Sequence, residues 1–340
     1  MSGNATIRYA NTAVLSVRAV DAPIVVTSDD MDAQLAHTYE RLSMRSGMLE
    51  NLAGIRERRW WPHDVTFTDA AAMAGAKAIA EAGVDPSQIG LLIDTSVSRA
   101  HLEPSAAVAV HHALELPTSA LNFDLANACL GFVNGMQLAA TMIDAGQIEY
   151  AVVVDGEGSR RTQERTIERL ASAKATKADV QAQFATLTLG SGAAAMVLGR
   201  ADRHSEGHRF LGGISRAGTE HHDLCVGDLE HMRTDTRGLL DAGLALSVAA
   251  WEEAKGSFDW SDMARYVSHQ ISQVHTNAMC ASLGIDPDLV PRTFPTRGNI
   301  GPASVPFTLA GEVETLSAGD RVLLMGIGSG LNVSCVELDW

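Results

Sequence analysis

The spacing of apolar residues changes from alternation to helical periodicity near the middle of the chain. Residues 121–125 alternate between apolar and polar, which predicts a strand. From Leu130 to Ile143 apolar residues recur at helical spacing, and Gly146 ends the predicted helix. Asn127 is a residue type that commonly caps helices, so we expect it to begin this one. Cys129 then lies at the junction, on the first helical turn.

Strands and helices are predicted to alternate along the rest of the chain. Strands are expected at residues 12–20, 89–97, 149–155, 192–199, 210–215, 265–268, 291–294, 320–326 and 331–338. Helices are expected at residues 28–42, 68–83, 105–116, 159–182, 236–255, 272–284 and 302–316. Three strand–helix pairs followed by two strands occur twice, which predicts an α/β fold with mostly parallel sheets and helices on their faces.

The second half of the chain repeats the first at a shift of 174 residues. This shift places Ile93 on Val267, and it places Cys129 on Ala303 near the start of the corresponding helix. An internal duplication explains the match, and it predicts halves at residues 1–200 and 201–340. Functional side chains in such folds gather at the carboxyl ends of strands, where Cys129, His269 and Asn299 are expected.

Cys129 is the candidate nucleophile. A thiol on the first turn of a helix experiences the positive end of the helix dipole, which favours the reactive thiolate. The alternative is a buried structural cysteine, because cysteine is among the most buried residue types. Position alone leaves both interpretations open.

Composition narrows the classes of partner. The chain has 340 residues, 46% hydrophobic and 20% charged, and its net charge of −15 argues against nucleic acid or an anionic membrane as the main partner. Its four cysteines are far apart in sequence, which favours reduced thiols. No apolar leader or bilayer-length run is present, so we expect a cytoplasmic protein with no membrane span.

Five motifs together resemble the thiolase superfamily, in particular its ketoacyl-acyl-carrier-protein synthase III branch. They are Gly54-Ile-Arg-Glu-Arg-Arg59, Asp124-Leu-Ala-Asn-Ala-Cys-Leu-Gly-Phe132, His269-Gln270, Gly298-Asn-Ile-Gly-Pro-Ala-Ser304 and Gly326-Ile-Gly-Ser-Gly330. The resemblance implies the thiolase fold, with two duplicated βαβαβαββ halves, mixed sheets and α-β-α-β-α layers. It further implies a homodimer in which Cys129, His269 and Asn299 are catalytic.

Within this branch, residues 94–105 are most similar to enzymes that join two fatty acyl-CoAs head to head in olefin biosynthesis. That likeness implies that Glu103 reaches the partner's active site across the dimer interface. The branch usually continues His-Gln-Ala-Asn-x-Arg after the catalytic histidine. The segment that begins at His269 lacks that Asn and Arg, which makes carrier-protein docking doubtful and favours acyl-CoA for both substrates.

These residue types suit a Claisen condensation through an acyl-Cys129 intermediate, with acyl-CoA as substrate and no cofactor. His269 and Asn299 can bind the enolate oxygen, while the N–H groups of Cys129 and of the Ser329–Gly330 turn can bind the tetrahedral intermediate. An ordinary acyl-CoA needs a general base, for which Glu103 is the candidate. The resemblance also implies CoA contacts by a basic and aromatic cluster: Arg56, Arg58, Arg59 and Trp60.

Other interpretations remain open. A decarboxylating synthase III would use malonyl-ACP or malonyl-CoA and need no base. The chain is alternatively a non-catalytic subunit of a condensing heterodimer, or a cysteine hydrolase if no second substrate fits. Alone, Glu103 suits a solvated acid near a helix start, His269 a core histidine and Asn299 a turn residue. A metal site at His221, His222, Cys225 and His231 is the weakest interpretation, because their spacing matches no standard zinc pattern.

Overall fold

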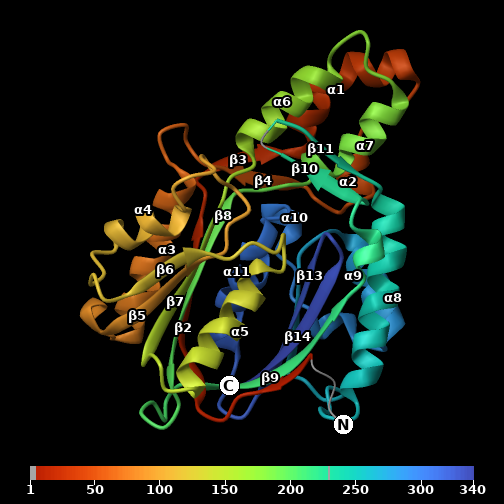
Figure 1. Cartoon of the computed structure of the whole chain (residues 1–340). Coiled ribbons are helices and arrows are strands. Elements are labelled where there is room, and N and C mark those ends of the chain that lie inside the picture. The colour runs from red at the N-terminus through yellow and green to blue at the C-terminus, as the bar shows by residue number, and fades with distance from the viewer. Residues whose placement is uncertain (1–4, 229) are drawn as a thin grey trace.

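The computed structural model describes residues 5–228 and 230–340, and its centre is one large mixed sheet (Figure 1). The strands run in the order β12-β13-β14-β9-β2-β8-β7-β5-β6, and β1 pairs with β9. Their bounds are β1 Thr6–Arg8, β2 Thr12–Asp21, β5 Ile89–Asp94, β6 Leu121–Asp124, β7 Tyr150–Glu157, β8 Gly192–Arg200, β9 His208–Ala217, β12 Arg265–Ser268, β13 Arg321–Gly328 and β14 Asn332–Asp339.

The two halves of the sheet have matching strand relations. In the first half β5 is parallel to β7 and β7 is antiparallel to β8; in the second, β12 is parallel to β13 and β13 is antiparallel to β14. This is the duplication that the 174-residue repeat predicts. The expectation of mostly parallel sheets is wrong, however, because β2, β8, β9 and β14 all pair antiparallel. Only strands joined by a helical crossover need to be parallel, whereas β13 and β14 form a hairpin.

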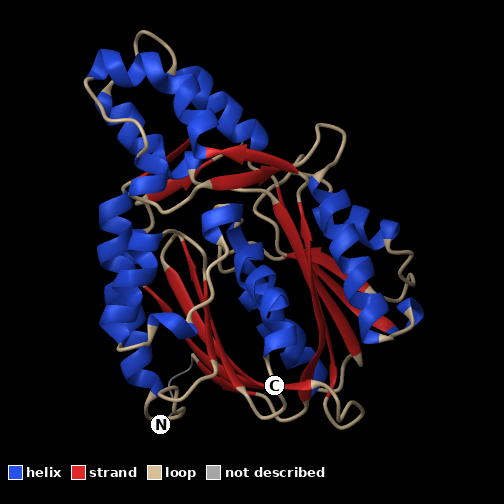
Figure 2. Ribbon diagram, turned by 180° about the vertical axis from the view of Figure 1, so that it is seen from behind, coloured by secondary structure: helices blue, strands red, loops and turns tan. Residues whose placement is uncertain are grey.

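Helices form three layers around the sheet (Figures 1 and 2). The central helices α5 (Gly131–Asp144) and α11 (Ser304–Glu312) lie between the two halves of the curved sheet. On one outer face lie α3 (Phe67–Ala82) and α4 (Ala106–Ala113), and on the other lie α8 (Thr236–Ala254) and α9 (Gln273–Leu283). The alternating sheet and helix layers match the predicted thiolase arrangement.

Strand alternation distributes side chains between three cores. Leu91 and Ile93 join the central core with α5, whereas Leu92 faces the alanine-rich α3. In the other half Leu324 joins the central core, and Leu323 packs with α8 and α9. Successive side chains of a strand point to opposite faces, so strands covered on both sides are apolar throughout.

The remaining elements surround one end of the sheet. They are β3 (Ile24–Thr27), β4 (Glu57–Trp60), β10 (Cys225–Gly227), β11 (Met232–Thr234), α1 (Ser28–Leu42), α2 (Met48–Asn51), α6 (Arg160–Leu170), α7 (Lys177–Leu187) and α10 (Phe294–Arg297). The short antiparallel strand pairs β3–β4 and β10–β11 were not predicted, because their three or four residues are too few to show a period. Within the part of the chain that the structure describes, no helix has the length and apolar character needed to cross a bilayer.

The strand predicted at residues 291–294 is wrong. Residues 291–293 are irregular and α10 begins at Phe294. The amide of Gln270 takes the place of a neighbouring strand: its Nε2 donates to Pro291 O at 3.1 Å, and its Oε1 accepts from the N–H groups of Thr293 at 2.8 Å and Phe294 at 3.3 Å. These bonds satisfy the segment's backbone without a sheet.

Candidate active site

Cys129 lies in a tight turn between β6 and α5. The preceding residue, Ala128, has φ +45°, a left-handed conformation that is uncommon for a residue with a Cβ. The helix begins only at Gly131, so Cys129 precedes the first helical turn and does not lie on it. Asn127 does not cap the helix: its Nδ2 donates to Asn134 Oδ1 at 2.7 Å, and its Oδ1 accepts from Asn332 Nδ2 at 3.2 Å.

The end of β13 packs directly against this turn. A Cβ at Gly328 would lie 2.7 Å from Asn127 O, and one at Gly326 would lie 2.5 Å from Leu130 Cδ1. Only glycine allows the backbones to approach so closely. The predicted role of the segment from Gly326 to Gly330, close backbone packing at the site, matches this geometry.

His269 follows the last residue of β12 and is buried, with 7% of its surface exposed. Its backbone N–H donates to Met325 O at 2.8 Å, which extends the pairing of β12 and β13 by one residue. Burial lowers the pKa of the imidazole to about 3, with a smaller contribution from His275. The ring is therefore neutral at neutral pH.

Asn299 is held at its backbone and at its side-chain oxygen. Its N–H donates to Thr188 O at 2.9 Å, and its C=O accepts from Gly190 N at 2.8 Å. Its Oδ1 accepts from Gly301 N at 3.0 Å. The Nδ2 donor remains available to a substrate oxygen, since no described residue accepts from it.

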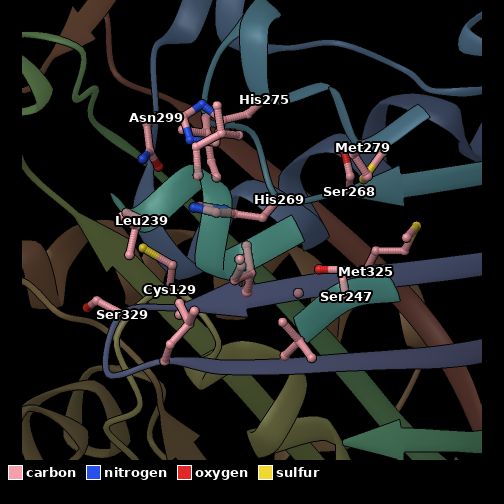
Figure 3. A pocket seen from close by; sticks show the side chains of 18 of the residues that line it. Cys129, Leu239, Ser247, Ser268, His269, His275, Met279, Asn299, Met325 and Ser329 are labelled. Atoms are coloured by element: carbon pink, nitrogen blue, oxygen red, sulfur yellow. The ribbon is translucent and has the colours of Figure 1, made fainter. Parts of the chain in front are cut away.

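Cys129, His269 and Asn299 line one cavity that is partly open to solvent (Figure 3). The three side chains come from three elements that are far apart in sequence, and the structure brings them together as predicted. Most of the lining is apolar, with Leu239, Leu244, Met279 and other side chains from α8, α9 and β13. A cavity with a few polar groups at one place and an apolar extension suits a ligand with a reactive head and a hydrocarbon tail.

The expected depression of the Cys129 pKa is wrong in direction. Burial raises the pKa of the thiol to about 12, and the carboxyls of Glu157 and Asp155 add to the rise, as does Cys225. Desolvation and nearby acids disfavour the thiolate, and they outweigh the helix terminus at Gly131. The resting enzyme therefore holds a protonated thiol beside a neutral imidazole.

The turn after β13 lies at the same cavity, which Ser329 lines. Gly330 has φ +122°, a conformation open chiefly to glycine. The N–H groups of Cys129 and Gly330 donate to no other group among residues 5–228 and 230–340. They are available for an anionic oxygen.

Glu103 is exposed and does not line the cavity of its own chain. It lies on the loop of residues 97–105, between β5 and α4. The structure of one chain therefore does not bring it together with Cys129.

The predicted CoA contacts separate into buried and accessible residues. Arg58 is fully buried, and its guanidinium donates to Ser28 Oγ at 3.1 Å and Leu187 O at 3.1 Å. Burial lowers its pKa to about 10. Arg58 therefore braces the pairing of β3 with β4 and offers no surface to a phosphate, which corrects its assignment.

Arg56 is exposed, whereas Arg59 pairs with Glu57 at 2.8 Å. Trp60 is half-buried, and its Nε1 donates to Gln163 Oε1 at 2.6 Å. Arg56 is thus the most accessible member of the cluster, and Arg59 and Trp60 are partly engaged within the chain.

Two features of the site were not assigned from the sequence. His275 lines the cavity, with its Nδ1 2.8 Å from Ser272 Oγ, and burial lowers its pKa to about 4. Asp155 and Glu157 place two buried acids at the end of β7. The only available signal for them was two acids at the end of an otherwise apolar strand, which position alone does not distinguish from a strand terminus.

No three or more His, Cys, Asp or Glu side chains of the described residues are arranged to hold a metal ion. In the region of the histidine-rich segment, Cys225 Sγ contacts Thr234 Oγ1 at 3.3 Å and lines the cavity.

Two family profiles match the chain. Residues 123–214 match 3-oxoacyl-[acyl-carrier-protein (ACP)] synthase III, and residues 254–340 match the C-terminal part of 3-oxoacyl-[ACP] synthase III. The first matched segment contains Cys129, and the second contains His269 and Asn299.

Similar proteins cover almost the whole chain. An acyl-CoA:acyl-CoA alkyltransferase of Xanthomonas campestris is 44% identical over 98% of this chain and 99% of its own length. One of the same description from Shewanella oneidensis is 33% identical over 98% of this chain and 100% of its own length. A beta-ketoacyl-[acyl-carrier-protein] synthase III of Streptomyces coelicolor is 26% identical over 86% of this chain and 88% of its own length.

The fold agrees with solved structures of these relatives. A crystal structure of a cysteine variant of Xanthomonas campestris OleA, with bound lauric acid and lauroyl-CoA, superposes with a TM-score of 0.96 at 43% identity. It covers 98% of this chain and 100% of that one. A structure of a glutamate variant of the same protein superposes equally well, with a TM-score of 0.96.

Proposed function

This chain belongs to the OleA-like acyl-CoA:acyl-CoA alkyltransferases of the 3-oxoacyl-[ACP] synthase III family, and from that premise we propose how its residues condense two acyl-CoAs. The enzyme is an acyltransferase that performs a head-to-head Claisen condensation. The observation that carries the residue assignment is the meeting of Cys129, His269 and Asn299 in one largely apolar cavity.

The first half-reaction transfers an acyl group to Cys129. The sulfur attacks the thioester carbonyl of the first acyl-CoA while the neutral ring of His269 accepts the thiol proton. The N–H groups of Cys129 and Gly330 bind the oxyanion of the tetrahedral intermediate. The C–S bond to CoA then breaks, CoA leaves as the thiol with that proton, and acyl-Cys129 remains.

The second half-reaction forms the carbon–carbon bond. Glu103 of the partner subunit removes a proton from the α-carbon of the second acyl-CoA. His269 and Asn299 donate hydrogen bonds to the enolate oxygen. The α-carbon attacks the carbonyl of acyl-Cys129, the Cys129 sulfur leaves and takes up the proton that Glu103 removed, and a 3-oxoacyl-CoA forms.

A homodimer is part of this proposal, because Glu103 is remote from the cavity of its own chain. Exposed apolar residues surround Glu103 in sequence: Leu102 is fully exposed, and Val97, Val108 and Leu121 are each about half exposed. Leu121 begins β6, which pairs only with β5 among the described residues and forms an edge of the sheet. An exposed edge strand with apolar neighbours is normally covered, and a second copy of the chain would cover it.

We place CoA near Arg56, with Arg59 and Trp60 beside it, because this part of the chain carries accessible cationic and aromatic groups. The proposal includes no cofactor, no nucleic acid and no carrier protein. Four free cysteines are consistent with a reducing, cytoplasmic location.

The test is to incubate the purified chain with a single fatty acyl-CoA and identify products by mass spectrometry. We expect a 3-oxoacyl product, or the acid and ketone derived from it, without malonyl-CoA. Product that forms only when malonyl-CoA or malonyl-ACP is added would instead identify a decarboxylating synthase. A chain that forms no acyl-Cys129 and condenses nothing under either condition would identify a non-catalytic partner subunit.

A further inference from the structure

Glu157 is a buried acid whose carboxylate accepts hydrogen bonds only from one loop among the described residues. It is the last residue of β7, and 6% of its surface is exposed. Its Oε1 accepts from the N–H groups of Val97 at 2.6 Å and Ser98 at 3.4 Å, and its Oε2 accepts from Ser98 Oγ at 2.6 Å. Ser98 Oγ in turn accepts from Gly158 N at 3.1 Å, which closes the connection between β7 and the loop.

The loop in question, residues 97–105, carries Glu103. Its far end is held by a second acid: Asp124 accepts from the N–H groups of Ala106 at 3.0 Å and Ala107 at 2.9 Å. Arg99 lies 3.6 Å from the same carboxylate. The loop is therefore anchored to Glu157 where it leaves β5 and to Asp124 where it enters α4, with Glu103 exposed between the two anchors.

Burying Glu157 is unfavourable, because two further buried carboxyls, Asp94 and Asp155, face the same region. Burial raises the pKa of Glu157 above its usual range, and the pKa of Asp94 rises to about 6 for the same reason. Glu157 is also one of the two carboxyls that raise the pKa of Cys129. An acid at this place weakens the nucleophile, and the hydrogen bonds that offset its burial all go to the loop.

We propose that Glu157 is a positioning residue that fixes the start of the 97–105 loop and thereby sets where Glu103 enters the active site of the partner subunit. This inference rests on the proposed function, in which Glu103 acts across the dimer. Because a displacement of about 1 Å can lower a rate by about a hundredfold, loss of the anchor should slow proton removal in the partner's site without slowing acylation there.

The experiment uses mixed dimers purified through two different affinity tags. Chain X carries Cys129→Ala and donates Glu103; chain Y carries Glu103→Ala and contributes Cys129. The X–Y dimer has one complete site. Glu157→Ala is then placed on X or on Y, and both acylation of Cys129 and condensation of a fatty acyl-CoA are measured by mass spectrometry.

Placed on X, Glu157→Ala should lower condensation by about tenfold or more while acyl-Cys129 still forms. Placed on Y, it should not lower condensation by more than about twofold, because there it removes only a charge that disfavours the Cys129 thiolate. Glu157→Gln on X should recover most of the rate, since the Gln Oε1 can still accept from Val97 N. Equal losses from the two placements, or a larger loss on Y, would overturn the proposal. An inactive X–Y dimer without any Glu157 change would overturn the proposed function and this inference together.

Two further variants separate positioning from general damage. Ser98→Ala removes the side-chain half of the anchor from the loop and leaves the buried acid in place, so it should show the same asymmetry even if Glu157→Ala does not fold. Asp155→Asn is the matched control, because this acid shares β7 and the vicinity of Cys129, and its Oδ2 accepts from Thr95 Oγ1 at 2.7 Å and not from the loop. The proposal would also be contradicted if Asp155→Asn on chain X lowered condensation as strongly as Glu157→Ala does there.

Discussion

Asn332 Nδ2 donates to Asn127 Oδ1 at 3.2 Å, although 205 residues separate the two side chains in sequence. Asn127 begins the turn that presents Cys129, and Asn332 begins β14, just after the turn that presents Ser329 and Gly330. The bond therefore joins the turn of Cys129, the proposed nucleophile, to the turn of Gly330, whose N–H we propose as an oxyanion donor. Neither half contains a complete site, so the duplicated halves must be packed together before the chemistry can occur.

The close approach of β13 to the Cys129 turn gives the first prediction. Gly328→Ala should lower stability and abolish acylation, because its Cβ would lie 2.7 Å from Asn127 O, a backbone atom that cannot move aside freely. We expect a loss of about 1–3 kcal/mol, typical of overpacking. Gly311→Ala is the control: a Cβ there meets nothing within 4 Å, and alanine in a helix should be neutral or stabilising by up to about 1 kcal/mol. Thermal unfolding measures the stability of each variant, and intact-mass analysis after acyl-CoA treatment measures acylation of Cys129. Equal behaviour of the two variants would contradict the packing argument.

Asn299 gives the second prediction. Asn299→Ala should leave acylation of Cys129 largely intact and slow condensation by about a hundredfold to a thousandfold, because it removes one donor to the enolate oxygen. Asn51→Ala, at an exposed residue of α2 outside the cavity, is the matched control. If Asn299→Ala condensed acyl-CoA at the wild-type rate, Asn299 would only form the turn and would not bind the enolate oxygen.

The third prediction concerns the pH dependence of Cys129. Its thiol has a pKa raised to about 12, so the thiolate fraction should grow by about tenfold per pH unit through the neutral range. His269, with a pKa lowered to about 3, stays neutral there and forms no imidazolium partner that would stabilise the thiolate. Alkylation by iodoacetamide, followed by peptide mass spectrometry, should therefore keep rising up to at least about pH 9. A plateau of the alkylation rate near neutral pH would contradict the raised pKa. The Cys129→Ala variant is the control, because it shows how much alkylation occurs at Cys225.

Glu103 gives the fourth prediction. Glu103→Ala should accumulate acyl-Cys129 and form no product from a fatty acyl-CoA, since no base remains to remove the α-proton. Mixing it with Cys129→Ala should restore roughly a quarter of wild-type activity, because half of randomly paired dimers are mixed and each has one complete site. Glu314→Ala, another exposed glutamate, should behave as wild type. If Glu103 serves its own subunit, mixing restores nothing, and an active Glu103→Ala homodimer removes the base role.

The resemblance to a known family indicated the three residues that meet in the cavity, and the amino-acid sequence by itself determined the order of the main strands and helices and the duplication. These follow from local chemistry: apolar periodicity reports which face is buried, and Gly146 and Gly284 end helices because they adopt a left-handed conformation at low cost. The strand at Arg265–Ser268 and the helix from Gln273 to Leu283 were predicted to within a residue. Motif order placed Cys129, His269 and Asn299 at strand ends. The structure has Cys129 after β6 and His269 directly after β12, whereas Asn299 follows the short helix α10, because the strand expected at residues 291–294 does not form.

Only the tertiary structure decided what depends on groups distant in sequence. Arg58 looked like a ligand for phosphate, yet the carbonyl of Leu187, 129 residues away, accepts from its buried guanidinium. The pKa of Cys129 rises because Glu157 and burial act on it through space, which outweighs the local helix terminus. Gln270 prevents a strand by satisfying backbone groups more than 20 residues later. Apolar periodicity depends only on residues that are close in sequence, whereas burial, electrostatic fields and long-range hydrogen bonds exist only after the chain has folded.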